Sequence, residues 1–248
     1  MREAGILALK TFRGTIKSWI KDKNSPVSEA DMAVNDLLHD RLSGADFGWL
    51  SEESVDDPLR LAARQVWVVD PIDGTRAYLA GLPDWTIAAA LVENGRPVAA
   101  AIYAPVAAEL FTATAGAGAW CNGRAIMTTD GAALDGARVA GPRSYLERLQ
   151  AAGPTIVATP RVHSLALRFT RVAQGTLDAA MASENSHDWD LAAADLLVHE
   201  AGGLLTTFSG RGLTYNRPET MHEALVAAGR GRHEQLIGLV QARRIPFA

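Results

Sequence analysis

The sequence predicts a mixed α/β fold, and three patterns in its 248 residues support this prediction. First, a bulky apolar strand at 67–69 runs into a carboxylate, and a helix at 75–80 follows soon after. Second, strands at 85–92 and 98–103 flank Asn94-Gly95, a pair that strongly favours a hairpin turn. Third, strand and helix patterns alternate through the second half of the chain. The length fits one large domain or two closely fused halves.

Composition is that of an ordinary globular protein. Hydrophobic residues make up 48% of the chain, charged residues make up 21%, and the formal net charge is −4. This acidic balance argues against a broad nucleic-acid-binding surface. The single cysteine, Cys121, excludes an internal disulfide framework. No apolar run reaches membrane-spanning length, and residues 1–7 lack the features of a signal peptide. We therefore expect a cytoplasmic protein that binds neither nucleic acid nor membrane.

The N-terminal segment is expected to form two helices separated by a polar break. Apolar residues recur at helical spacing over 2–20, and the polar stretch 21–26 then interrupts the pattern. Ser28 and Asp31 have the spacing of a capping box, which predicts that a second helix begins there. A short apolar strand at 47–50 follows, and it runs directly into a pair of acidic residues.

The stretch around which the chain is organised is Val68-Val69-Asp70-Pro71-Ile72-Asp73-Gly74-Thr75. Pro71 has no N–H group, so strand pairing is expected to end there. After a turn, the helix that starts at Thr75 leaves its first N–H groups without intrahelical acceptors. Glu52 follows the preceding strand, so we expect it to lie at the same sheet edge as Asp70.

These residue types suit a metal ion and a phosphate bound together. Carboxylates attract hard divalent cations, and a helix N-terminus attracts an anion. In the alternative interpretation, Asp70 merely ends a strand and Asp73 merely caps a helix. Asp31 would then belong only to a capping box, and Asp190 would only complement a helix dipole.

The rest of the chain is expected to alternate strands and helices. A long helix begins near Asp188 and ends before Gly202, which is a good residue just past a helix end. The six histidines show no metal-ligand spacing, and the chain has no Walker A loop or G-x-S-x-G elbow. Strands are expected at 110–113, 138–140, 155–158, 177–181, 204–208 and 224–228, and further helices at 164–173 and from about 230.

Three separated segments together resemble one family. They are Trp49-Leu50-Ser51-Glu52-Glu53-Ser54, then 67–75, then Trp189-Asp190-Leu191-Ala192-Ala193 with Glu200-Ala201-Gly202-Gly203. In order and spacing they look like the signatures of the inositol monophosphatase family, which are Mg²⁺-dependent, lithium-sensitive phosphomonoesterases. The resemblance covers nearly the whole chain. It implies a layered αβαβα sandwich, often a homodimer, with most metal ligands in residues 1–134 and Asp190 in residues 135–248.

The resemblance also implies roles for individual residues, and two or three Mg²⁺ ions per site. Glu52, Asp70 and the carbonyl of Ile72 correspond to the ligands of one ion. Asp70, Asp73 and Asp190 correspond to those of a second ion. Asp31 and Thr75 correspond to the pair that orients the attacking water, with help from Glu52. The N–H groups of Gly74 and Thr75 correspond to those that hold the phosphate. The substrate contacts correspond to Asp73, Ser164 and Glu184.

The resemblance leaves the substrate open between two branches of the family. Segments 24–31 and 102–105 look like the 3′(2′),5′-bisphosphate nucleotidase branch, whereas 111–114 and 122–123 look like the inositol monophosphatase branch. His163 stands where many members have glycine. A nucleotide bisphosphate needs an apolar or aromatic face for its base and a cation for its second phosphate, and the candidates are Tyr78, Trp85 and Arg76 or Arg161. We therefore expect a 3′-phosphate of a nucleotide bisphosphate to be preferred over inositol 1-phosphate.

Two other classes are consistent with parts of the sequence. One is a haloacid-dehalogenase-type phosphatase, which needs two aspartates two positions apart in D-x-D-G-T. Asp70 and Asp73 are three positions apart, so this class is disfavoured. A non-catalytic regulator is the other alternative, because some bacterial relatives of the family are implicated in binding transcription factors. The complete set of ligands favours retained catalysis by direct attack of water.

Overall fold

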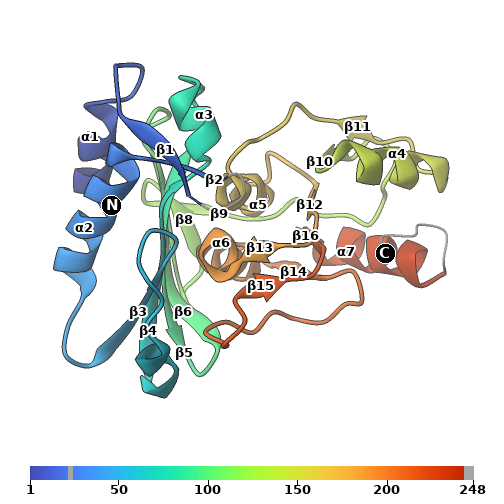
Figure 1. Cartoon of the computed structure of the whole chain (residues 1–248). Coiled ribbons are helices and arrows are strands. Elements are labelled where there is room, and N and C mark those ends of the chain that lie inside the picture. Colours follow the sequence, from blue (N-terminus) through green and yellow to red (C-terminus); the bar gives the residue numbers. More distant parts are fainter. Residues whose placement is uncertain (22–24, 243–248) are drawn as a thin grey trace.

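The computed structural model describes residues 1–21 and 25–242, and these form five layers (Figure 1). Its helices are α1 (Arg2–Leu9), α2 (Glu29–Leu42), η2 (Pro58–Ala62), α3 (Thr75–Leu79), α4 (Arg143–Ala151), α5 (Leu165–Ala173), α6 (Asp188–Glu200) and α7 (Arg230–Gln241). Helices α1 and α2 cover one face of a large sheet, and α5 and α6 lie between that sheet and a smaller one. Helices α4 and α7 form the outermost layer. The predicted αβαβα sandwich is confirmed.

Seven strands form the large sheet in the spatial order β3-β4-β5-β6-β7-β8-β9. They are β3 (Phe47–Ser51), β4 (Gln65–Asp73), β5 (Thr86–Glu93), β6 (Arg96–Ala104), β7 (Glu109–Thr114), β8 (Ala119–Cys121) and β9 (Arg124–Ile126). Strands β3 and β4 are parallel, with Ser51 paired to Val69, and the other neighbours are antiparallel. The parallel pair brings the ends of β3 and β4 to one edge, as predicted. The Asn94-Gly95 hairpin is also confirmed, since both residues have positive φ, 51° and 76°.

The smaller sheet has five strands in the order β11-β10-β12-β16-β14. They are β10 (Arg138–Ala140), β11 (Val157–Ala158), β12 (Ala179–Ala182), β14 (Gly203–Thr207) and β16 (Leu225–Gly229). A two-stranded ribbon, β13 (Ser186–His187) with β15 (Met221–His222), lies next to α6. The described helices do not include one that is both long and apolar enough to cross a membrane.

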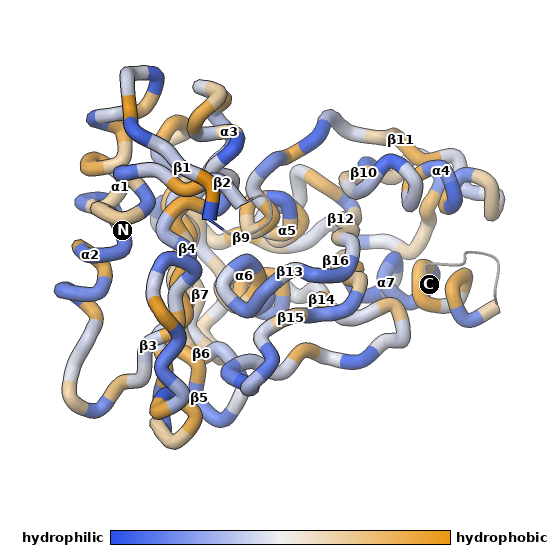
Figure 2. The backbone as a smooth tube through the Cα atoms, viewed as in Figure 1, coloured by the Kyte–Doolittle hydropathy of each residue, from blue (hydrophilic) through white to orange (hydrophobic). Residues whose placement is uncertain are grey.

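The main core lies between the large sheet and α6. Leu50, Ile102 and Phe111 point from the sheet towards Leu191 and Leu197 of the helix, and all five are almost fully buried. In Figure 2 the strands of the large sheet are predominantly in the hydrophobic colours. The middle of α6, residues 191–198, is buried throughout and apolar except for Asp195, as expected for a helix whose faces are both covered by sheets.

The N-terminal expectation is wrong in one respect. The helix predicted over 2–20 ends at Leu9, and residues 18–21 form strand β1 (Ser18–Lys21), which pairs with β2 (Ser25–Ser28). Arg13 adopts a left-handed conformation with φ of 62°, which an α-helix does not accommodate. Phe12 instead packs its ring against two core aromatic rings. Tertiary packing therefore overrides the helical spacing of the apolar residues.

Several short elements escape the sequence patterns. Helix α4 buries only Leu146 and Leu149, so its apolar stripe is too thin to stand out. The ribbon strands β13 and β15 contain two residues each, too few for any alternation to be visible. Of the strand expected over 155–158, only Val157–Ala158 is regular.

Candidate metal and phosphate site

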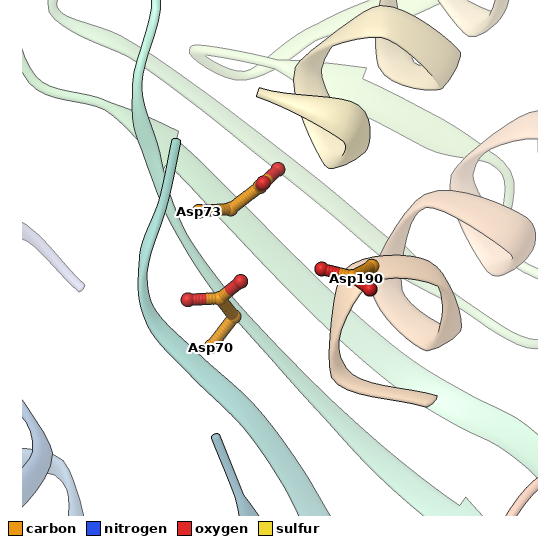
Figure 3. Close-up of side chains that lie close together, drawn as sticks. All are labelled: Asp70, Asp73 and Asp190. Atoms are coloured by element: carbon orange, nitrogen blue, oxygen red, sulfur yellow. The ribbon is translucent and has the colours of Figure 1, made fainter. Parts of the chain in front are cut away.

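Asp70 and Asp73 lie where β4 departs from regular pairing. The register with β5 shifts between these two residues, and pairing resumes with Asp73 opposite Thr86. The expectation that pairing ends at Pro71 is therefore only partly right, because the strand continues as a bulge. A bulge changes the direction in which side chains point. Figure 3 shows both carboxylates on the side that faces the first turn of α6.

Asp70 has no hydrogen-bond partner for either carboxylate oxygen within the part of the chain that is described, although its side chain is only 1% exposed. Burial raises the pKa of Asp70 well above its usual value, and the charges of Glu52, Asp73 and Asp190 raise it further. A buried, unpaired carboxylate is costly unless a cation accompanies it. These two oxygens are the clearest sign in the described structure that a metal ion belongs here.

Asp73 is held by the N-terminus of α5. Its Oδ2 accepts hydrogen bonds from the hydroxyl of Ser164 (2.5 Å) and the N–H of Ala166 (2.6 Å), and its Oδ1 accepts one from the N–H of Leu165 (3.1 Å). Burial raises the pKa of Asp73, while these hydrogen bonds act in the opposite direction. A metal-ligating carboxylate is commonly oriented by such outer hydrogen bonds, which fix the direction of its free lone pairs.

Asp190 lies in the first turn of α6. The N–H of His187 donates to Asp190 Oδ2 at 2.6 Å, an arrangement that also caps the helix. Burial raises the pKa of Asp190 well above its usual value, and the charges of Asp73 and Glu52 raise it further. The helix dipole partly offsets this, because negative charge is favoured near a helix N-terminus.

The three carboxylates form one cluster (Figure 3). Asp70, Asp73 and Asp190 each offer an oxygen, and these oxygens all lie within 4.8 Å of one another. When all three carboxylates are ionised, they can only accept hydrogen bonds, and none can then satisfy another by donation. Oxygen donors at this spacing suit Mg²⁺, and the orphaned oxygens of Asp70 complete the fit.

Glu52 faces the same cleft but has a partner of its own. The ammonium group of Lys21 lies 3.3 Å from Glu52 Oε1 and 2.6 Å from Oε1 of Glu53. Burial raises the pKa of Glu52 to about 7, although Lys21 lowers it. No sequence pattern indicated Lys21, because it belongs to the expected polar break and meets its partner only through the β1–β2 hairpin.

Asp31 and Thr75 are in contact, as the resemblance implies. The Thr75 hydroxyl is 3.0 Å from Asp31 Oδ1 and 3.0 Å from the carbonyl oxygen of Ile72. Asp31 Oδ2 accepts from the N–H of Ser28 at 2.8 Å, so the predicted capping box is also formed. Burial raises the pKa of Asp31, against the effect of these hydrogen bonds. Asp31 therefore both completes the capping box of α2 and accepts a hydrogen bond from Thr75.

A cleft with a volume of about 1360 Å³ opens over the carboxylate cluster. Gly74 lies on its wall with φ of +94°, a conformation that residues with a Cβ rarely adopt. Positive or ionisable basic side chains also line it, from Arg76, Arg161, His163 and His187. Its remaining lining residues are Ser25, Pro26, Glu52, Asp70, Asp73, Thr75, Ala77, Ala80, Leu82, Asn185, Asp190 and Met221.

Four residues expected near the substrate are placed elsewhere. Ser164 is fully buried behind Asp73, and Glu184 is exposed and lies outside the cleft lining. The expectation that Tyr78 or Trp85 offers an aromatic face is wrong, because both rings are buried in the core against Phe12. The apolar character that suggested a binding face is explained by core packing.

The basic residue His163 is fixed by a partner that the sequence did not reveal. Asp84 Oδ2 accepts from the N–H of His163 at 2.6 Å and lies 2.7 Å from its ring Nδ1. The imidazole is thereby held on the cleft wall. Similarly, the ring of His187 stacks on Trp189, with centroids 4.5 Å apart and an angle of 4°. His163 and Asp84 are 79 positions apart, so no local pattern could reveal their contact. His187 and Trp189 are two positions apart, and a contact between them could have been predicted.

Comparison with known proteins gives a consistent answer. The sequence profile of the inositol monophosphatase family matches residues 2–244. Nus factor SuhB of Xylella fastidiosa is 36% identical over 201 residues, covering 77% of this chain and 72% of the relative. Inositol-1-monophosphatase of Rhizobium meliloti is 32% identical over 197 residues, covering 75% and 73%. The crystal structure of extragenic suppressor protein SuhB from Bartonella henselae superposes with a TM-score of 0.85 at 29% identity, covering 97% and 95%.

The fold and the acidic cleft thus define a phosphatase of the layered αβαβα type with Mg²⁺ as its metal. This chain belongs to the inositol monophosphatase family. Its similarity spans both the sequence segments that carry the acidic residues and the whole layered architecture.

Proposed function

We propose that this chain hydrolyses a small phosphate monoester and that Asp70 is the residue on which metal binding centres. The observation that carries the proposal is the pair of buried Asp70 oxygens without a hydrogen-bond partner, beside Asp73 and Asp190. Asp70, Asp73 and Asp190 would hold one Mg²⁺. Glu52, Asp70 and the carbonyl of Ile72 would hold another. Bound Mg²⁺ supplies Lewis acidity next to the phosphate.

The surrounding residues then position the reacting groups. Thr75 and Asp31, 3.0 Å apart, form a hydroxyl–carboxylate pair that orients a water molecule for in-line attack on phosphorus. Glu52 lies at the same cleft and assists in accepting the proton of that water. The N–H groups of Gly74 and Thr75, at the start of α3, donate to the phosphate oxygens.

The cleft lining supports a substrate with a second anionic group. The lining acids (Glu52, Asp70, Asp73 and Asp190) all belong to the proposed metal centre. The wall beyond the metal centre instead carries basic side chains, including Arg76 and Arg161. An inositol ring needs several acceptors for its hydroxyl groups, because unpaired buried polar groups are costly. We therefore place a 3′(2′),5′-bisphosphate nucleotide ahead of inositol 1-phosphate, with the imidazole of His187 in place of the expected aromatic face.

A phosphate-release assay with Mg²⁺ tests both levels of this proposal. The substrates are 3′-phosphoadenosine 5′-phosphate, myo-inositol 1-phosphate, fructose 1,6-bisphosphate and histidinol phosphate. We expect Mg²⁺-dependent release, highest for the nucleotide, and none in Asp70→Asn. Asp46→Asn, which removes an exposed acid outside the cleft, is the matched control. Absence of release from all four contradicts the activity, and a kcat/KM about tenfold higher for inositol 1-phosphate overturns only the ranking.

A regulatory binding role is a second candidate. It is favoured by the 36% identity with a relative named as a Nus factor. The two functions can be separated with Asp70→Asn, since a binding role that does not use the cleft should survive loss of the phosphatase activity. If partner binding and catalysis are lost together, the binding role depends on the metal centre.

A further inference from the structure

A buried arginine joins two parts of the chain that are distant in sequence. Arg60, in η2, is only 2% exposed. Its Nε and Nη2 donate to the two carboxylate oxygens of Asp56 at 2.6 and 2.9 Å. Its Nη1 donates to Oδ1 of Asn216 at 2.6 Å, and its Nη2 to the carbonyl of Arg217 at 3.1 Å. Every bond follows the planar fork of the guanidinium group, which lysine cannot reproduce.

Asn216 passes this connection on to α6. Its side-chain amide donates back to the carbonyl of Arg60 at 3.3 Å, and its backbone N–H donates to Oδ2 of Asp188 at 2.7 Å. Asn216 has φ of 56°, in the left-handed region. This conformation directs the amide side chain to Arg60 while the backbone N–H reaches Asp188. Asn216 therefore contacts Arg60 through its side chain and Asp188 through its backbone, so a substitution can remove the first contact and keep the second.

Asp188 is the first residue of α6 and is fully buried. Besides the Asn216 N–H, it contacts Nε2 of His222 at 2.7 Å, and a carboxylate can only accept there. Asp190 follows two residues later on the same helical turn. Glu52 lies eight residues before Arg60, in the segment between β3 and η2. The network Arg60–Asn216–Asp188–His222, here called the clasp, thus connects the segments that carry these two proposed ligands.

We propose that the clasp is a positioning device that sets the affinity of the metal centre by fixing the first turn of α6 relative to the loop after β3. The proposal rests on the metal site argued above. Mg²⁺ tolerates little deviation from octahedral geometry, so ligands drawn from separate elements must be held at fixed separations. The large sheet fixes Asp70 and Asp73, whereas Asp190 belongs to a helix of another layer. Packing on the large sheet holds the body of α6, and the clasp adds a polar constraint at its first turn.

The test measures binding of Mg²⁺ alone by isothermal calorimetry to the full chain. Asn216→Gly removes the link to Arg60 but keeps the backbone N–H and tolerates positive φ. Asp188→Asn alters the acceptor, and Arg60→Lys removes the fork. Arg96→Gln is the matched control, because Arg96 also ties the first half to the same loop, through the carbonyl of Leu213 at 2.8 Å, without touching the clasp. Circular dichroism and thermal unfolding without metal show whether each variant is folded.

We expect Asn216→Gly and Asp188→Asn to weaken Mg²⁺ binding by about tenfold or more, with Arg96→Gln close to wild type. Mg²⁺ affinity within about twofold of wild type in folded Asn216→Gly and Asp188→Asn overturns the proposal. Equal weakening in Arg96→Gln also overturns it, since general loosening of the loop would then be the cause. If the wild-type chain itself binds no Mg²⁺, the proposed metal centre fails, and the clasp fails with it.

Discussion

At the scale of single residues, the site is defined by which polar atoms are satisfied and which are not. Asp73 and Asp31 receive hydrogen bonds from the protein, whereas the buried oxygens of Asp70 receive none. Such an unsatisfied group persists in a native structure when function requires it. The sequence could indicate Asp70 as a ligand, but not that it alone of the three aspartates has no hydrogen-bond partner.

Replacement of Asp70 by asparagine separates function from stability. Asp70→Asn should reduce kcat by at least about 10²-fold, because the metal centre loses its central charge. The metal-free variant should be no less stable than wild type, since a buried carboxylate surrounded by other acids is removed. Phosphate release and thermal unfolding in EDTA measure the two effects. A variant that is inactive because it unfolds would contradict this expectation.

Thr75 should affect turnover more than substrate affinity. Thr75→Ala removes the hydroxyl that faces Asp31 but leaves the backbone N–H groups, so we expect kcat to fall by about 10²-fold with KM changed less than about threefold. Thr75→Ser, which restores the hydroxyl, should recover most of the activity. Steady-state kinetics at saturating Mg²⁺ provide both constants. A change confined to KM would identify Thr75 as a substrate contact only.

At the scale of elements, predictability followed the range of the interactions. The capping box of α2 and the Asn94-Gly95 hairpin depend on residues close in sequence, and both were predicted. After the end of α1, Phe12 packs against distant rings and residues 18–21 pair with β2, so the helical spacing of the apolar residues was misleading. The placement of Ser164 behind Asp73 likewise depends on a contact across 91 positions, which no local pattern reveals.

Helix α5 offers a test in which one side chain has two functions. Ser164 accepts from the N–H of Leu167 at 2.9 Å as the N-cap and also donates to Asp73. Ser164→Ala should lower the free energy of unfolding by about 1 kcal/mol. It should also weaken Mg²⁺ binding, because Asp73 loses one of its orienting bonds. Ser164→Thr keeps the hydroxyl and is the control, and a stability loss with unchanged Mg²⁺ affinity would leave only the capping role.

At the scale of the whole molecule, stability depends on how the α6 layer buries polar groups between the two sheets. Asp195 is buried in this layer and accepts a hydrogen bond from the hydroxyl of Tyr215 at 2.9 Å. Burial raises its pKa from 3.8 to about 6, although that hydrogen bond acts to lower it. The folded chain therefore binds a proton here over a pH range in which the unfolded chain has released it.

This difference predicts a pH dependence. The stability contributed by protonated Asp195 is fully present below the unfolded pKa and is lost as pH rises through about 6. Relative to wild type, Asp195→Asn should gain about 1–3 kcal/mol in free energy of unfolding between about pH 4 and pH 7. Urea unfolding of both proteins in EDTA at several pH values isolates this term. Parallel pH curves for the two proteins would refute it.

The expected homodimer is also a property at this scale, and it stays a prediction. Sedimentation velocity should give twice the mass of the chain, and a monomer at all accessible concentrations would exclude it. The division of the chain at residue 134 is likewise untested. It follows the alternation pattern, whereas α6, from the second half, packs directly on the large sheet of the first.

The unpaired oxygens of Asp70 have a consequence for the life of the protein in a cell. A ligand that binds only the native chain stabilises it by an amount that grows with the logarithm of the free ligand concentration. The carboxylates of the acidic cluster destabilise one another unless a cation is bound. The Mg²⁺ concentration should therefore control the stability of the folded chain as well as its activity. When free Mg²⁺ is scarce, more of the chain should be unfolded and open to proteases. Its abundance in a cell should therefore fall with the Mg²⁺ concentration.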